Sequence, residues 1–165
     1  MIFRRIILVA GAVMAAGGLW LTASALLIPV KAAVAQFLLQ RAWDTTLAGG
    51  EQVRPWPWAD TWPVARLRLP DQEADLIVLA GASGQALAFG PGHVTGTAIP
   101  GDEGISVIGG HRDTHLSVLA GMRPGHRVEV QRADGAVRRF LVARTSVADA
   151  RRKWILPTGQ SGVVL

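Results

Sequence analysis

The longest uncharged stretch of this chain, from Ile6 to Val30, constrains its fold more than any other feature. It contains 25 residues without a charged side chain, whereas an α-helix needs only about 20 to cross the hydrocarbon layer of a bilayer. The apolar region of a cleavable signal peptide is shorter, about 7 to 15 residues. We therefore predict an uncleaved, single-pass transmembrane helix. Arg4 and Arg5 precede it and favour the cytoplasmic side, so the rest of the chain is expected to face outward.

Two segments of different composition follow this helix. Residues Ala32 to Trp43 lack helix breakers and are rich in Ala, Leu and Gln, which predicts a helix leaving the membrane. It would serve as a stalk on the membrane surface or pack on the domain that follows. Leu47 to Pro63 holds two adjacent glycines and three prolines, which predict an irregular linker. Its three tryptophans would either anchor at the lipid headgroups or cover the domain's own core.

From Val64 onward the hydrophobic period becomes that of β-strands. Val64 to Leu69 alternates apolar residues with arginines, as expected of a strand with one buried face. Further strands are predicted at Leu76 to Ala80, Gln85 to Phe89, Ile105 to Gly110, Arg127 to Arg132, Ala136 to Ser146 and Gly162 to Leu165, with a short helix or turn at Leu116 to Leu119. Asp134-Gly135 is a hairpin signal. Many short strands with Gly and Pro turns predict an all-β domain, a closed or nearly closed barrel.

The net charge of +5 is unevenly distributed along the chain. Lys31 to Met122 contains 6 basic and 9 acidic residues, whereas Arg123 to Leu165 contains 9 basic and 3 acidic residues. Most of the later arginines alternate along a predicted hairpin, as on a solvated strand face, and no aromatic residues are interleaved for base stacking. We therefore expect no nucleic-acid partner.

His111 stands where a predicted buried strand gives way to a loop. Gly109 and Gly110 precede it, and their lack of side chains lets another chain's backbone approach the imidazole. With an ordinary pKa of about 6.5, a histidine transfers protons near neutral pH. His111 is therefore the candidate catalytic residue, with a structural histidine at a loop entrance as the other interpretation. Asp113 and Arg112 are weaker candidates for orienting it or lining a substrate loop.

The remaining histidines suggest other roles, of which metal binding is the first. His111 and His115 have the i, i+4 spacing of two metal ligands on a helix. The preceding glycines favour a loop, and no glutamate lies between the two histidines, so we predict no metal site and no cofactor. His93 is interpreted as a turn residue, and His126, just before a strand, is expected to face solvent.

The spaced glycines, proline and histidine of this region resemble the centre of a sortase, a cell-surface cysteine transpeptidase. The matching pieces are Gly90 to His93, Gly96 to Pro100, Gly101, Gly104 and Gly110 to Asp113. The tryptophan-rich stretch from Pro55 to Pro63 and the HRDTH form are most similar to the sortases of marine and other Gram-negative proteobacteria. The resemblance extends from Gln36 to the end of the chain.

The resemblance implies a domain organisation and a reaction. Residues 1–31 would be a cytoplasmic stub and transmembrane anchor, 32–63 a helical stalk and linker, and 64–165 a sortase-like β-barrel outside the inner membrane. The enzyme would cleave a protein substrate at a Leu-Pro-x-Thr-Gly-like sorting signal, after threonine. His111 would protonate the leaving amine, and the acyl group would pass to an amine acceptor on the cell surface or to water. The family's catalytic arginine follows its cysteine, so Arg112 does not inherit that role.

One departure from the sortase pattern is large, because the chain contains no cysteine. In sortases the strand at the place of Gly162 to Leu165 ends in Thr-x-Cys or a variant, and a last strand supplies an arginine. We therefore expect the sequence to be a fragment, inactive by itself, with a barrel incomplete at its C-terminus. The alternative is a sortase-like peptide-binding or structural module without a nucleophile. Leu156 to Gly159 resembles a shortened sorting signal and is interpreted as a turn.

Overall fold

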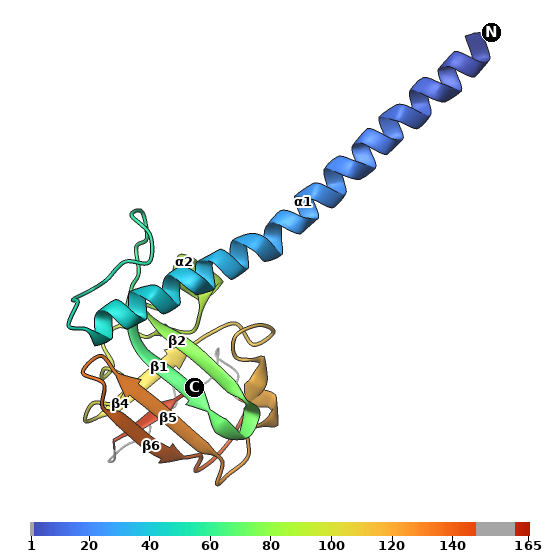
Figure 1. Cartoon of the computed structure of the whole chain (residues 1–165). Helices are drawn as coiled ribbons and strands as arrows, with labels where there is room; N and C mark the ends of the chain where they lie inside the picture. Colours follow the sequence, from blue (N-terminus) through green and yellow to red (C-terminus); the bar gives the residue numbers. More distant parts are fainter. Residues whose placement is uncertain (1, 148–160) are drawn as a thin grey trace. The chain divides into compact units, whose positions relative to one another are not determined.

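The computed structural model describes residues 2–147 and 161–165 (Figure 1). By its contacts the chain divides into two compact units, Met1–Phe37 and Leu38–Leu165. Helix α1 (Ile2–Leu47) begins in the first unit and ends in the second. The remaining elements are β1 (Pro63–Leu69), η1 (Pro70–Gln72), β2 (Ala74–Ala80), α2 (Gly84–Phe89), β3 (Gly92–His93), β4 (Ile105–Gly109), η2 (Ser117–Gly121), β5 (Arg127–Arg132), β6 (Val137–Leu141) and β7 (Gly162–Val164).

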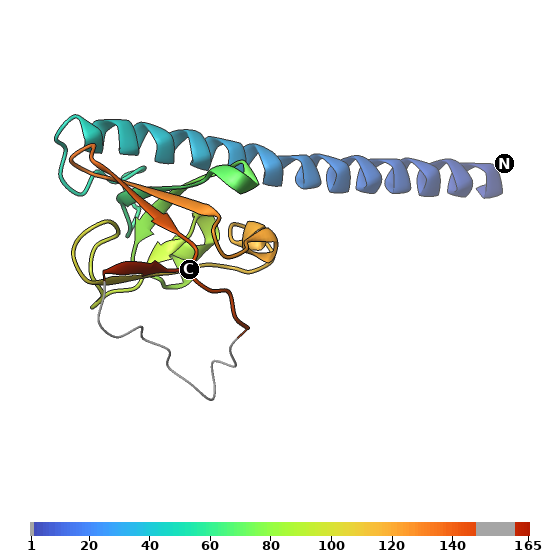
Figure 2. The same cartoon turned by 90° about the horizontal axis from the view of Figure 1, so that it is seen from below.

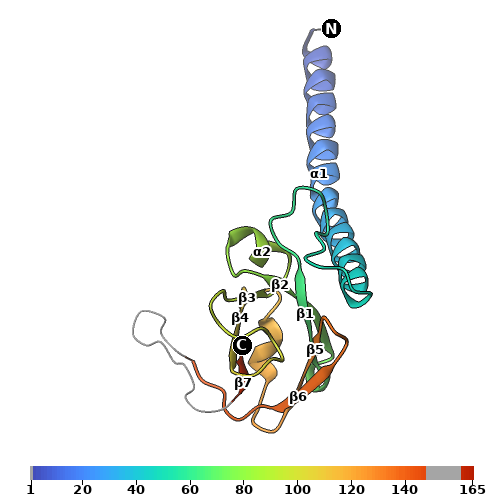
Figure 3. The same cartoon turned by 90° about the vertical axis from the view of Figure 1, so that its left-hand side faces the viewer.

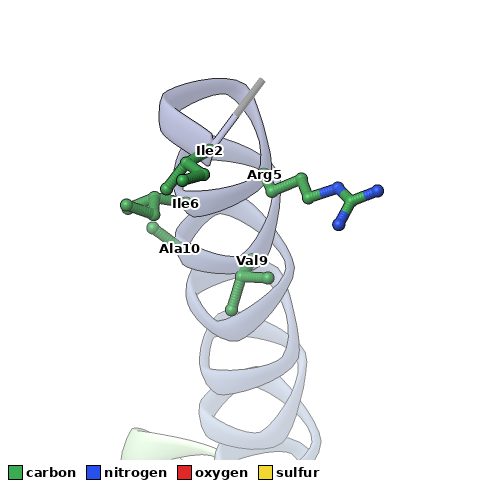
Figure 4. A pocket seen from close by; sticks show the side chains of 5 residues that line it. All are labelled: Ile2, Arg5, Ile6, Val9 and Ala10. Carbon is green, nitrogen blue, oxygen red and sulfur yellow. The ribbon is translucent and has the colours of Figure 1, made fainter.

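The first unit is the N-terminal part of α1. The predicted helix from Ile6 to Val30 is present, and within the described residues α1 is the one helix long and apolar enough to cross a membrane, by length and composition. Its large apolar side chains are exposed, including Leu8 and Trp20. At its start, Figure 4 shows Ile2 and Ile6 on one side of the helix while the Arg5 side chain extends away from them. These residues line only a shallow hollow on a helix surface.

The second unit is built on a seven-stranded sheet of order β6-β5-β1-β2-β3-β4-β7. Most neighbours are antiparallel, but β2 pairs with β3 and β4 pairs with β7 in parallel. In Figure 3 the strands β4 and β7 lie on the opposite side of this unit from β5 and β6. Side chains of both edge strands, Phe140 of β6 and Val163 of β7, nevertheless pack against one core. The sheet therefore curves into a nearly closed barrel, as predicted.

The barrel core follows from the alternation in β1. Ala65, Leu67 and Leu69 are each fully buried, and Arg66 and Arg68 between them are not. Val78, Ile108 and Val130 complete the core from three other strands. The predicted hairpin is also present: β5 and β6 are joined through Gly135, whose φ of 83° suits a residue without a side chain.

The end of α1 belongs to the second unit and packs on its sheet. Leu39 and Trp43, one helical turn apart, are 1% and 0% exposed and form a second cluster with Ile77, Leu79 and Ala86. Figures 1 and 2 show these last turns, in cyan, beside the strands. Of the two roles left open for this segment, packing on the domain therefore holds for these turns.

Two of the linker tryptophans, Trp56 and Trp58, differ in their surroundings. The rings of Trp56 and Phe89 meet edge to face, with their centroids 4.8 Å apart, and Phe89 packs on the cluster around Trp43. Trp58 is 80% exposed. Trp56 thus covers the core, whereas Trp58 does not.

The predicted strand from Gln85 to Phe89 is wrong, because these residues form helix α2. The run contains Gln, Ala and Leu but no β-branched residue, so its intrinsic preference is helical. Its first turn closes with the Leu87 amide donating to the Ser83 carbonyl at 3.1 Å. Strand β3 was not predicted, since two residues are too few to show a period. The Leu-Pro-Thr-Gly sequence at 156–159 lies outside the described residues.

Candidate active site around His111

The backbone leading to the site is held by glycines at close approaches. Gly92 of β3 lies opposite Gly109 of β4. A Cβ on Gly92 would overlap the carbonyl oxygen of Gly81, so only glycine lets β3 lie so near that turn. These two strands place the end of β4 beside the loop that follows β2.

His93 fixes the loop between β3 and β4 through its ring. Its Nε2 lies 2.9 Å from the Ala98 carbonyl oxygen, to which it donates, and 3.0 Å from Thr97 Oγ1. The Thr97 hydroxyl donates to the Val94 carbonyl at 2.8 Å and accepts from the Val107 amide at 3.2 Å. His93 was interpreted as a turn residue, but it is the last residue of β3, and its ring ties the following loop to β4 through Thr97.

His111 lies two residues beyond the end of β4, and its side chain is exposed. Its carbonyl oxygen accepts from the amides of Thr114 at 3.3 Å and Leu116 at 3.2 Å. Within residues 2–147 and 161–165, no hydrogen bond or ion pair joins its imidazole to another group. The backbone thus closes a turn at His111 and leaves the ring free for a partner.

Arg112 and Asp113 extend into solvent in the same turn. No ion pair of either side chain is found in the described part of the chain. The structure therefore brings neither residue onto the His111 ring. Because residues 112–116 form a turn and not a helix, the i, i+4 spacing of His111 and His115 does not place two ligands on one helix face. Among the described residues, no group of three or more His, Cys, Asp or Glu could hold a metal ion.

His126 was expected to face solvent, and this expectation is wrong. The residue is half-buried, and its Nδ1 is buried without a hydrogen-bond partner among the described residues. Its backbone explains the burial, since its carbonyl oxygen accepts from the Val142 amide at 2.9 Å and draws it into the β5–β6 pairing. It lies away from the His111 turn in the sequence and belongs to the barrel wall.

Charge pairs concentrate on β1, β2 and β5, away from His111. Asp71 accepts from the Arg127 backbone amide at 2.7 Å and from Arg127 Nη2 at 3.0 Å. The side-chain hydrogen bond of Arg127 holds the pKa of the Asp71 carboxyl below its ordinary value. Arg66 donates twice to Asp75, at 2.6 and 2.7 Å, and this pairing raises the pKa of the Arg66 guanidinium. Arg66 thus pairs across the β1–β2 strands, whereas Arg127 pairs with η1.

A larger hollow of about 450 Å³ lies elsewhere in the second unit. Its walls come from the turn after α1, the start of β1, the loop before β4 and the β5–β6 turn. The residues lining it include Gly50, Trp62, Ile99, Asp102, Arg132 and Asp134. Arg132 bridges Asp102 at 2.8 Å and Asp134 at 3.2 Å, so much of its charge is internally paired. His111 lines neither this hollow nor the shallow one on α1.

Sequence reasoning missed Leu116. Its side chain is 6% exposed in a turn whose other members are exposed or half-buried. It lies over Gly110, the residue before His111. The available signal was an apolar residue placed directly after the polar HRDTH run.

Strand β7 lies beside the strand that leads to His111. Ile105 of β4 lies opposite Gly162, and Val107 lies opposite Val164, in a parallel pair. The carboxyl ends of the two strands therefore meet at the same edge of the sheet. Ser161, just before β7, strengthens the pair by accepting from the Gly104 amide through its hydroxyl at 2.9 Å.

Comparisons with solved structures find several sortases to which this chain is similar. The chain is similar to sortase A from Corynebacterium diphtheriae (21% identity, TM-score 0.48, 68% of this chain and 65% of that one). It is also similar to a Clostridium perfringens sortase D5 transpeptidase (17%, 0.51, 68% and 73%), and to sortase C-1 from Actinomyces oris (28%, 0.45, 50% and 49%). This chain thus spans less than two thirds of the first and about half of the third. No curated protein sequence matches it.

The family comparison covers most of the barrel. A family model described as the sortase domain matches residues 67–165, which is more than half of the chain. The matched region contains every strand after β1 together with the His111 turn. The likeness to the Clostridium perfringens structure supports the same fold. This chain therefore belongs to the sortase family.

Proposed function

We propose that this chain forms the anchor and the histidine-bearing part of a sortase that acts as a cysteine transpeptidase. The substrate would be a protein with a Leu-Pro-x-Thr-Gly-like sorting signal, and the acceptor an amine on the cell surface. The observation that carries the proposal is the parallel pairing of β4 and β7, which supports a site at the carboxyl ends of both strands. His111 lies near that edge, and its exposed ring has no hydrogen-bond or ion-pair partner among residues 2–147 and 161–165.

The register of this pair supports a location for the nucleophile. His111 lies four residues beyond Val107, so in a chain that continues past Leu165 it would face the position four residues beyond Val164. The sortase resemblance implies a cysteine at the end of this strand. A thiolate there would attack the threonine carbonyl, forming an acyl–sulfur bond as the peptide C–N bond breaks. The His111 imidazolium would protonate the departing amine.

The second half of the reaction uses the same imidazole in reverse. Now neutral, His111 would take a proton from the incoming amine as that amine attacks the thioester. A new amide bond forms, and the cysteine sulfur leaves as a thiolate. Because the ring must accept and release a proton near neutral pH, an exposed histidine suits the task, and within the described part of the chain His111 forms no ion pair.

The location of the enzyme is part of the proposal. Helix α1 would anchor it in the inner membrane as a single span, with Arg4 and Arg5 on the cytoplasmic side and the barrel outside. The similarity of the HRDTH form to proteobacterial sortases supports the periplasmic face. No cofactor is required by this chemistry.

A second function is supported by the absence of cysteine from the 165 residues. The barrel would then bind a sorting-signal peptide, or serve as a structural module, without cleaving it. The two functions make different predictions for one peptide. Cleavage of a Leu-Pro-x-Thr-Gly peptide supports the enzyme, whereas binding of the intact peptide supports the module.

The test uses the protein translated from the gene through its stop codon. We expect a cysteine near the position that the β4–β7 register indicates, and thiol-dependent cleavage of a fluorogenic sorting-signal peptide. His111→Ala should lower kcat/KM by roughly 100-fold or more, because general acid–base catalysis contributes about 10²–10⁴. His115→Gln, four residues away, is the matched control and should stay within a few-fold of the parent. Full activity of His111→Ala would remove His111 from the mechanism.

A further inference from the structure

No hydrogen bond or ion pair of the described residues holds the His111 ring, so we consider the backbone that carries it. That backbone turns sharply after β4, where the His111 carbonyl accepts two amide hydrogen bonds. One of these donors is the amide of Leu116. Whatever fixes Leu116 therefore also fixes the turn at His111.

The Leu116 side chain is seated on the residue just before His111. A Cβ added to Gly110 would lie 2.7 Å from Leu116 Cγ and 2.8 Å from its Cδ1, but 3.7 Å from the Cα of Pro91. Leu116 thus covers the bare backbone of Gly110, and Pro91 lies at ordinary contact distance on another side. Leucine and glycine form a matched pair here, because a side chain on Gly110 would need the space that Leu116 fills.

The other end of Leu116 is tied to the barrel through η2. The Leu119 amide donates to the Leu116 carbonyl at 3.1 Å, and the Met122 amide donates to the Leu119 carbonyl at 3.1 Å. Leu119 and Val118 pack against the core, and Met122 belongs to it. The backbone of Leu116 is therefore tied to η2, which packs on the core, and its side chain contacts Gly110, the residue before His111.

We propose that Leu116 is a positioning residue for His111, acting through Gly110 and the turn backbone without touching the imidazole. The inference rests on the proposed transpeptidase function but makes a claim of its own about the ring. Leu116 fixes the position of the His111 ring at the strand edge. This positioning does not require a hydrogen bond to the ring. A misplacement of the catalytic group of about 1 Å can lower the rate by about 100-fold.

The kinetic test compares Leu116, the last residue of the turn, with Leu119 of η2 in the complete protein. Leu116→Ala should lower kcat about tenfold or more while KM changes less than about twofold, because the substrate still binds but the proton carrier is misplaced. Leu119→Ala is the matched control, since it removes the same side chain from η2 without uncovering Gly110. Leu116→Met, which conserves volume, should restore most of kcat. Equal kcat losses in the two alanine variants would overturn the proposal.

A double-mutant cycle tests the contact with Gly110. The φ of Gly110 is not in the left-handed region, so the expected harm of Gly110→Ala comes from collision with Leu116 and not from backbone strain. Removing the collision should help: Gly110→Ala/Leu116→Ala should retain more activity than the product of the two single effects predicts. Simple multiplication of the two effects would contradict the proposed pairing.

A spectroscopic measurement separates this inference from the proposed function. The Cε1–H NMR signal of His111, assigned by its loss in His111→Gln, should shift or broaden in Leu116→Ala and stay unchanged in Leu119→Ala. This result supports positioning even if His111→Ala proves fully active, an outcome that would reject the transpeptidase role alone. An unchanged His111 signal in Leu116→Ala, or equal changes in both variants, would overturn the positioning role.

Discussion

The β1–β2–β5 face and the His111 turn are stabilised in opposite ways. On the face, buried leucines alternate with arginines that pair with carboxylates, as Arg66 does with Asp75. In the turn, the described structure shows no charge pair, and one leucine with two backbone hydrogen bonds holds the chain. The difference teaches that the charge pairs of the described residues stabilise the strand face, whereas the turn that carries the candidate residue His111 is held by backbone hydrogen bonds and one buried side chain.

The largest effect should follow from removing a core side chain on the face. Leu67 is fully buried in β1, so Leu67→Ala should lower the free energy of unfolding by about 2–5 kcal/mol. His111→Ala, at an exposed site, should change it by less than about 0.5 kcal/mol. Urea unfolding of both variants measures the contrast. A similar loss in both would mean that the turn contributes to the core after all.

A smaller effect should follow from removing arginines. Arg66 makes two short hydrogen bonds to Asp75 at a partly exposed site, so Arg66→Ala should cost about 0.2–1 kcal/mol. Arg112→Ala in the turn should cost nothing measurable. The Arg66 effect should shrink at about 1 M salt, where the screening length falls to about 3 Å. A larger cost at Arg112 would reveal a partner for its guanidinium and blur the contrast between the regions.

The smallest effect concerns acid. Arg127 lowers the pKa of Asp71 below its ordinary 3.8 in the folded state, so the ionised carboxyl stabilises the fold above that value. This contribution is lost as the pH falls below about 4 and passes through the folded-state pKa. Between about pH 5 and pH 2, the melting temperature of the parent should therefore drop more steeply than the melting temperature of Asp71→Asn. Parallel curves for the two proteins would show that the pair contributes nothing.

The sequence predicted the fold best where a hydrophobic alternation extends over several residues. The alternation of Val64 to Leu69 predicted the buried face of β1 correctly, and Asp134-Gly135 predicted the β5–β6 turn. Gln85 to Phe89 was misassigned, because a short apolar run fits either a strand or a helix until its residue types are weighed. Strand β3 left no period to detect.

The candidate site was less accessible to sequence reasoning than the fold. The position of His111 at a strand end was predicted, since glycines and β-branched residues mark that place. The role of Leu116 was not, because the contact between its side chain and Gly110 depends on a turn whose path no local pattern specifies. The burial of His126 was missed for the same reason, as it follows from pairing with Val142 across the hairpin.

The parallel pairing of β4 with β7 has a consequence for how the molecule is made. Ile105 and Gly162 meet across a long intervening stretch of chain, and such contacts form slowly because the loop-closure entropy is lost before the contact contributes. The edge beside His111 is therefore expected to be completed late in folding. In the proposed enzyme, the groups at the carboxyl ends of β4 and β7 would therefore come together only after the barrel has formed.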